Sequence, residues 1–254
     1  MRLGVWLGLG VVLGAAPQKP LVREELRVSV NGVVERWRLE WRSPPELACF
    51  ETEGVTCPCE GFAQGEQGEL DLVRQRPGAP EERVALTPLF ADDGGGDAPV
   101  RAVLRGWEVS ARDGALTEEE RPRALRRRKR VRAMVLGDYD HDGQAREFVL
   151  QTQASGCGLR DAVLLGVDRR DGHLRALGTV EHPDRPLVLE PETWAKLRGA
   201  ARVDSVETPC GDHGSESESV VRVHADAAGL HATRAFYTCT PEGQRGASAS
   251  SEVL

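Results

Sequence analysis

The sequence predicts a β-dominated α+β fold, made of antiparallel hairpins with one or two helices. Aromatic residues make up only 5% of the 254 residues, whereas 28 glycines and 15 prolines interrupt the chain at short intervals. Short alternating segments bounded by such residues are typical of β-strands and turns rather than of helical bundles. No internal repeat of fixed period is present, which argues against a propeller or a solenoid.

The clearest strand signal is a hairpin around Asn31-Gly32. Residues 26–30 and 33–41 alternate on either side of this dipeptide, which tolerates the positive φ angles of a type I′ turn. Two more hairpins are expected, with turns at residues 168–172 and 226–229. Their strands, and the remaining expected strands, cover residues 162–167 and 174–180, 220–225 and 230–238, 84–90, 100–110, 131–136 and 147–153. Trp37, Trp41 and Trp107 fall within these strand patterns and are expected in the core rather than on a sugar-binding platform.

Two helices are expected. Thr117 and Glu120 have the spacing of a capping box, which predicts a helix from there to about residue 130, weakened by Pro122. Pro191 is suited to the first turn of a second helix over residues 191–197.

The charge of the chain does not favour a nucleic-acid partner, because its formal net charge is −7. One short segment is strongly basic although the whole chain is acidic. It is interpreted either as a solvated helix face or as a site for an anionic partner. The run consists of Arg121, Arg123, Arg126, Arg127, Arg128, Lys129, Arg130 and Arg132.

The first sixteen residues predict a signal peptide. Arg2 is followed by fourteen residues, 3–16, without a charge, which matches the apolar core of a signal peptide and is too short for a membrane span. Small residues at positions 14–16 suit cleavage after Ala16, and no later stretch predicts a transmembrane segment. The mature protein is therefore expected to be exported, to the periplasm or the extracellular space.

The rest of the chain is expected to form one β-rich domain over residues 20–240, with a possible subdivision near residue 115. The tail over residues 243–254 is small and polar and is expected to be disordered. The even number of cysteines in an exported chain predicts up to three disulfides, with the pairing open. The candidates are Cys49, Cys57, Cys59, Cys157, Cys210 and Cys239.

Residues 138–147, Asp-Tyr-Asp-His-Asp-Gly-Gln-Ala-Arg-Glu, carry the strongest chemical signal. Carboxylates at alternate positions converge when the chain curls around a point, and calcium binds six to eight oxygen ligands at about 2.3–2.6 Å. Gly143 allows the sharp turn that such a loop needs. The predicted ligands are Asp138, Asp140, Asp142, the backbone carbonyl of Gln144, and Glu147. The alternative is an acidic hairpin turn in which Asp and Gly serve turn geometry alone.

These residues resemble the Asp-x-Asp-x-Asp-Gly calcium loops of EF-hands, dockerins and FG-GAP repeats. The resemblance covers about ten residues and implies calcium as the bound ion. Glu147 stands one position after the last acid of an FG-GAP loop and two before that of an EF-hand. The apolar residues on both sides of the loop are more similar to FG-GAP surroundings. The longer run through Thr152 also resembles uncharacterised exported bacterial proteins, which implies no activity.

Two weaker patterns suggest other chemistry. Cys210 and His213, together with Cys57 and Cys59, have ligand types for zinc, but their spacing matches no common zinc framework and disulfides are favoured. Asp212 and His213 lie in a glycine-rich segment that would suit a hydrolase, although no nucleophile pattern accompanies them. His173, His182, His224 and His231 show no helical or paired spacing.

The sequence therefore favours a non-enzymatic, exported calcium-binding protein. In this hypothesis calcium has a structural role in a strand-loop-strand unit, and the protein acts as a binding or structural module. The alternative is an exported hydrolase with a structural calcium site and its active site around Asp212 and His213.

Overall fold

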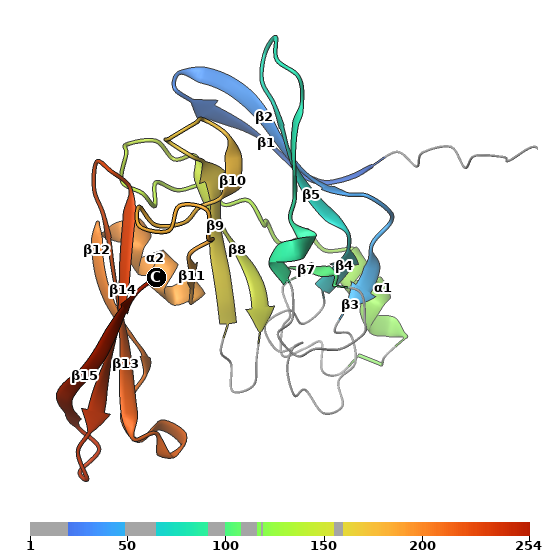
Figure 1. The fold of residues 1–254 in the computed structure, drawn as a ribbon. Helices are drawn as coiled ribbons and strands as arrows, with labels where there is room; N and C mark the ends of the chain where they lie inside the picture. Colours follow the sequence, from blue (N-terminus) through green and yellow to red (C-terminus); the bar gives the residue numbers. More distant parts are fainter. Residues whose placement is uncertain (1–19, 49–64, 91–99, 108–115, 118, 155–159) are drawn as a thin grey trace, which may run out of the picture.

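The computed structural model describes residues 20–48, 65–90, 100–107, 116–117, 119–154 and 160–254. These residues form four antiparallel sheets and two α-helices, so the predicted β-dominated α+β class is confirmed (Figure 1). Residues 1–16, which the sequence predicts as a signal peptide, and the cysteines at positions 49, 57, 59 and 157 lie outside the described residues.

The strands of the first two sheets alternate along the N-terminal part of the chain, whereas each of the other two sheets uses consecutive strands. The first sheet has the order β1-β2-β5-β6, formed by Leu21–Val30, Val33–Trp41, Leu70–Gln75 and Glu82–Ala85. A small sheet has the order β3-β4-β7, formed by Glu46–Ala48, Gly65–Gly68 and Ala102–Arg105. In the central sheet β9 (Arg160–Val167) pairs with β8, β10 and β11, formed by Glu147–Ala154, Leu174–Ala176 and Val188–Leu189. The last sheet has the order β12-β13-β14-β15, formed by Arg202–Thr208, Ser217–Ala225, Leu230–Cys239 and Arg245–Val253.

The central sheet lies between the first and the last sheets (Figure 1). Side chains on one face of a strand alternate with those on the other face, so a strand between two sheets supplies both cores. In β9, Val163 and Leu165 join the core under the first sheet, whereas Ala162 and Leu164 join the core under the last sheet. This double burial explains why β9 is almost continuously apolar.

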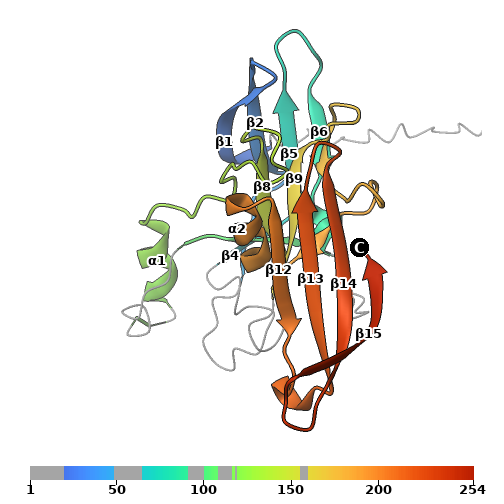
Figure 2. The same cartoon turned by 90° about the vertical axis from the view of Figure 1, so that its left-hand side faces the viewer.

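The two helices pack differently (Figure 2). Helix α1, Glu120–Arg126, begins with the predicted capping box, in which the Glu120 carboxylate accepts hydrogen bonds from the Thr117 N–H and hydroxyl. It ends earlier than expected, at Arg126. Helix α2, Pro191–Gly199, confirms the second prediction and buries Trp194 and Leu197 against the last sheet's core.

The three predicted hairpins are present. Asn31 and Gly32 have φ angles of 50° and 79°, as a type I′ turn requires, and β1 pairs with β2 up to Val30 and Val33. The hairpins β9–β10 and β13–β14 form around the expected turns. The three tryptophans expected in the core, Trp37, Trp41 and Trp107, are all buried.

The expected strand at residues 131–136 is wrong. These residues form no strand, and only Gly137 makes an isolated bridge to Glu147. The backbone N–H groups of Ala133 and Met134 donate instead to the carboxylate of Glu24, at 2.7 and 3.3 Å. A side chain of β1 therefore supplies the partner that a neighbouring strand would have supplied. The expected strand at residues 84–90 is only partly correct, because residues 87–90 form a 3₁₀ turn.

The expected disordered tail is also wrong. Residues 245–253 form β15, which pairs with β14 along most of its length. Leu254 then packs against the last sheet's core, and its N–H donates to the carbonyl of Ala232. Backbone pairing with β14 contributes much of what holds the tail, so its sequence carries little hydrophobic signal apart from the last residues.

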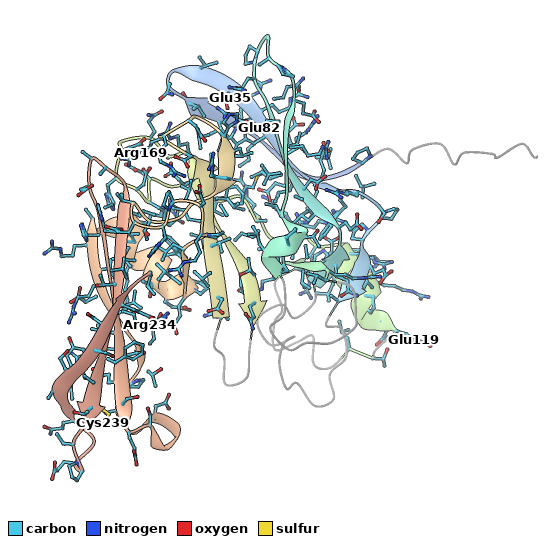
Figure 3. The ribbon with its side chains drawn as sticks, viewed as in Figure 1. Glu35, Glu82, Glu119, Arg169, Arg234 and Cys239 are labelled. Atoms are coloured by element: carbon cyan, nitrogen blue, oxygen red, sulfur yellow. A yellow bond between two sulfur atoms is a disulfide. The ribbon has the colours of Figure 1, made fainter. Side chains whose placement is uncertain are left out.

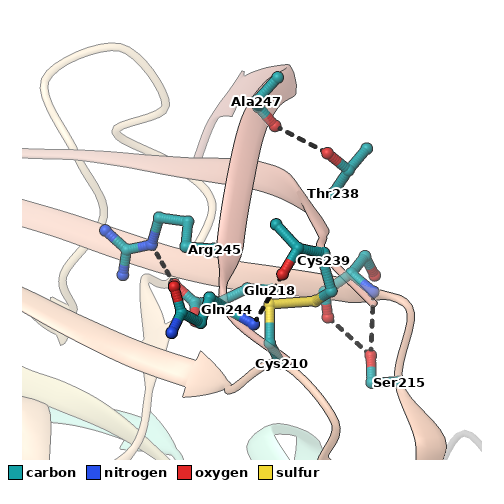
Figure 4. Close-up of a disulfide and its surroundings, with 10 residues drawn as sticks. Cys210, Ser215, Glu218, Thr238, Cys239, Gln244, Arg245 and Ala247 are labelled. Atoms are coloured by element: carbon teal, nitrogen blue, oxygen red, sulfur yellow. Dashed lines mark hydrogen bonds and ion pairs between the residues drawn. A yellow bond between two sulfur atoms is a disulfide. The ribbon is translucent and has the colours of Figure 1, made fainter. Parts of the chain in front are cut away.

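Cys210 and Cys239 form a disulfide at one end of the last sheet (Figure 4). It connects the 3₁₀ turn Asp212–Gly214 to the end of β14. Of the basic run, Arg130 and Arg132 form ion pairs with Glu66 and Glu24. No helix among the placed residues has both the length and the apolar character that a membrane span needs.

Candidate metal site

The loop before β8 curls as the alternating aspartates predict. The Asp138 carboxylate accepts the N–H groups of Asp142 and Gly143, at 3.0 and 2.9 Å. Two residues of the loop, His141 and Gly143, have positive φ angles of 53° and 87°. Glycine adopts this left-handed backbone without cost, which explains Gly143 at the turn.

Three of the five predicted ligands come together. Carboxylate oxygens of Asp138, Asp140 and Glu147 all lie within 4.8 Å of one another. Asp140 and Glu147 are buried, and Asp138 is half-buried. Three carboxylates this close repel each other when ionised, so the cluster needs positive charge or protons to be stable.

Glu147 is the most unusual member of the cluster. It has no exposed surface, and its Oε2 accepts the Tyr139 N–H at 3.1 Å. Its Oε1 is shielded from solvent and has no hydrogen-bond partner, although the Arg146 Nε lies 3.5 Å away. Burial first, and then the negative charge of Asp140, raise the pKa of Glu147 to about 8. A buried carboxylate oxygen without a partner is costly, and a cation would remove that cost.

The strand opposite makes room for this carboxylate. Glu147 pairs with Gly166 of β9, and a Cβ atom at that position would lie 2.8 Å from the Glu147 Cγ. The missing Cβ of Gly166 therefore leaves the space that the Glu147 side chain occupies. The sequence alone provides no signal for this role.

Two arginines partly neutralise the aspartates. The Arg169 Nε donates to the Asp140 carboxylate at 2.6 Å, and its Nη2 donates to the Asp140 backbone carbonyl at 2.6 Å. Asp142 forms an ion pair with Arg146. Arg169 lies between the central sheet and the last sheet (Figure 3), and sequence reasoning did not find it, because nothing in residues 168–172 marks a contact with the loop.

Asp142 and Gln144 are the two predicted ligands that lie outside this three-carboxylate cluster. The Gln144 backbone carbonyl accepts the Arg146 N–H at 3.0 Å. The Gln144 side-chain amide makes two hydrogen bonds with Asn31. The Gln144 Oε1 accepts the Asn31 backbone N–H at 2.9 Å, and the Gln144 Nε2 donates to the Asn31 Oδ1 at 3.1 Å. Gln144 therefore connects the loop to the tip of the β1–β2 hairpin.

His141 connects the loop to α2. It is exposed, as expected for a variable position of the loop, but its Nε2 lies 2.7 Å from the Leu197 carbonyl. A carbonyl only accepts, so this contact places the proton on Nε2. The loop thus contacts the first sheet, the central sheet and α2 at once, through Gln144, Arg169 and His141.

The residues of the weaker patterns lie elsewhere. The disulfide at Cys210 removes this cysteine from a zinc site. Asp212 and His213 are in the 3₁₀ turn beside this disulfide. Cys239, the other half of the disulfide, lies at the end of the molecule far from Arg169 (Figure 3).

Comparison of this chain with known proteins found no relative. The chain matches no protein-family model. Searches among curated proteins and among solved structures gave no match either.

Proposed function

We propose that this chain is an exported calcium-binding protein in which the ion has a structural role. One observation carries the proposal. Glu147 is completely buried next to the carboxylates of Asp138 and Asp140, and one of its own oxygens has no hydrogen-bond partner. Carboxylate oxygens are the ligands that calcium prefers, and each carboxylate can bind through one or two of them. Asp138, Asp140 and Glu147 would hold the ion, and water or backbone carbonyls would complete its shell.

The position of the loop supports a structural role rather than a catalytic one. An ion at this point would stiffen the loop that contacts the β1–β2 hairpin through Gln144, the β9–β10 turn through Arg169 and α2 through His141. A ligand that binds only the folded protein stabilises it, by about 0.4–1.4 kcal/mol at one to ten times its Kd. Extracellular calcium sites typically have Kd values of about 10⁻⁴–10⁻³ M, so millimolar calcium would reach this range.

The test is the stability of chelator-treated protein as calcium is added. We expect the melting temperature of the parent protein to rise with calcium up to millimolar concentrations, and Glu147→Gln to lose most of this rise. Glu242→Gln, which changes an exposed glutamate outside the loop, serves as the matched control and should respond like the parent. A parent protein that shows no response to calcium, or a Glu147→Gln variant that responds fully, would contradict the proposal.

Export rests on separate observations and has a separate test. The uncharged run over residues 3–16 and the Cys210–Cys239 disulfide both support it, because disulfides persist in oxidising compartments. When the full chain is expressed in a Gram-negative host, we expect mature protein in the periplasm or the medium, beginning near Pro17. A product that stays in the cytoplasm and still begins at Met1 would contradict export and leave the calcium proposal intact.

A further inference from the structure

The β13–β14 hairpin carries a second group of potential metal ligands, distant in sequence from the acidic loop. His224 and His231 are directly opposite each other on the two strands. Their rings stack with centroids 4.5 Å apart and an angle of 8° between the planes. Ligand atoms of His224, Asp226 and His231 all lie within 4.8 Å of one another.

The two ring nitrogens of His231 have different surroundings. Its Nδ1 lies 2.6 Å from the Glu181 carboxylate. Its Nε2 is shielded from solvent and has no hydrogen-bond partner, and the Asp226 Oδ2 is 3.4 Å away. A carboxylate that holds Nδ1–H leaves the Nε2 lone pair free, which is the usual arrangement of a histidine that binds a metal.

Asp226 is held in position by its own turn. Its Oδ1 accepts the N–H groups of Ala228 and Gly229, at 2.8 and 3.3 Å, and its backbone carbonyl accepts from Arg169 at 3.2 Å. The other carboxylate oxygen, Oδ2, is the one that lies toward His231. One oxygen therefore fixes the side chain, and the second remains available to an ion.

Three arginines lie near the imidazole pair, and one of them, Arg202 of β12, is directly opposite His224. Arg222 on β13 contacts the Tyr237 hydroxyl and the Asp204 carboxylate. Arg169 is paired with Asp140. Asp226 and Glu181 bring two negative charges to His231, which offset part of the positive charge of these arginines.

From this geometry we propose that His224, His231 and Asp226 bind a divalent transition-metal ion of the zinc class. Two imidazole nitrogens and one carboxylate oxygen form a ligand set that zinc accepts, with water in the fourth position, once one of the stacked rings turns so that both nitrogen lone pairs point at the ion. Calcium prefers oxygen alone, so this site and the cluster around Glu147 select different ions. The proposal does not depend on calcium binding by the loop.

The direct test is nitrogen NMR of the histidine side chains in the full, uniformly ¹⁵N-labelled protein. On addition of zinc sulfate, we expect the ring nitrogens of His224 and His231 to shift, with His231 fixed as the Nδ1–H tautomer. His173 is the matched control, because its Nδ1 also lies beside a carboxylate, at 3.1 Å from Glu82, and among the described residues it belongs to no cluster of three potential metal ligands. Its signals should stay in place.

Affinity measured by competition with a chromogenic zinc indicator completes the test. We expect His231→Gln to weaken zinc binding at least about tenfold, a loss of about 1.4 kcal/mol, and His173→Gln to leave it unchanged. Asp226→Asn keeps a side chain that caps the turn and removes the ligand charge, so it should also weaken binding even if His231→Gln folds poorly. The proposal would be overturned if the His224 and His231 signals do not shift when zinc is added, even if zinc binds elsewhere, for example at cysteines. Full affinity in a folded Asp226→Asn variant would also overturn it.

Discussion

Glu147 is both the last carboxylate of the acidic loop and the first residue of β8. Its backbone bridges Gly137 and pairs with Gly166, so the strand fixes its position, while its side chain returns toward the aspartates. At the residue scale, the site therefore depends on a charged group that the sheet keeps out of water. A buried carboxylate of this kind makes stability depend on pH and on cations.

The first prediction concerns the pH dependence of stability in the absence of calcium. The pKa of Glu147 is raised from 4.5 to about 8, mainly by burial. Between these values the folded chain keeps a proton that the unfolded chain has released, so the free energy of unfolding should fall as pH rises through this window. Thermal melts in chelator across this range should show the decline. Calcium binds the ionised carboxylate, so the stabilisation by calcium should increase with pH.

The control for this prediction is Glu147→Gln, which cannot titrate. The difference in melting temperature between the parent and this variant isolates the contribution of Glu147 from that of other groups. If the two proteins have the same pH dependence in chelator, burial does not raise the pKa of Glu147 as described.

The second prediction concerns Arg169, whose guanidinium is paired with the Asp140 carboxylate. Replacing it with methionine leaves Asp140 buried without its guanidinium, which should cost about 1–3 kcal/mol of stability in chelator. The same change removes a positive charge beside the ion, so calcium affinity should rise several-fold. Denaturant unfolding and calcium titration measure the two effects. A variant with weaker calcium binding would show that Arg169 supports the ion instead of competing with it.

At the scale of single elements, β15 shows how much backbone pairing contributes. Its sequence, Arg-Gly-Ala-Ser-Ala-Ser-Ser-Glu-Val, contains almost no large apolar residue, and most of its side chains are exposed. It is ordered because β14 offers a free edge and because Leu254 reaches the core, where the Thr179 hydroxyl donates to its carbonyl.

The third prediction is that ending the chain after Gly243 destabilises the last sheet. Each ladder hydrogen bond contributes about 0.5–1.5 kcal/mol, so the loss should be on the order of 2–4 kcal/mol by denaturant unfolding. The exposed β14 edge should also promote association, visible as a larger species in light scattering. Ser250→Ala, which removes an exposed hydroxyl and keeps the backbone, should change stability by less than about 0.5 kcal/mol. An unchanged truncated protein would mean that β15 contributes nothing to the sheet.

At the scale of the whole molecule, the central sheet joins two hydrophobic cores. Alternate residues of β9 belong to different cores, so neither core can lose the strand without exposing the other. The described sheets should therefore unfold together. The acidic loop lies at this junction, which is the position where a bound ion affects most of the fold.

The fourth prediction tests this coupling. Leu164→Ala and Leu165→Ala open cavities on opposite faces of β9, and each should cost about 2–5 kcal/mol. Both variants should still unfold in one transition, with far-UV circular dichroism and tryptophan fluorescence coinciding. Trp37 and Trp41 report on one core and Trp194 on the other. Separate transitions in either variant would show that the two cores are independent.

Local signals account for the parts of the fold that could be predicted from the sequence. Asn31-Gly32, the Thr117–Glu120 capping box and Pro191 each act through the backbone of a few adjacent residues, so they do not depend on distant partners. The loop over residues 138–147 is of the same kind, because alternating aspartates and one glycine specify the curl locally. The histidine pair was missed, although the predicted hairpin with strands ending at Ala225 and Leu230 already implies that His224 and His231 face each other.

By itself, the sequence determined the β-rich class, the three hairpins, the two helix starts and the curled acidic loop, since each follows from preferences of neighbouring residues. Only the tertiary structure decided that residues 131–136 bond to Glu24 instead of a strand, that residues 245–253 are ordered, and that Arg169 meets Asp140. It also decided that Glu147 is buried. These features depend on which groups the folded chain brings together, because a backbone edge, a carboxylate or a guanidinium has no fixed partner until distant segments meet.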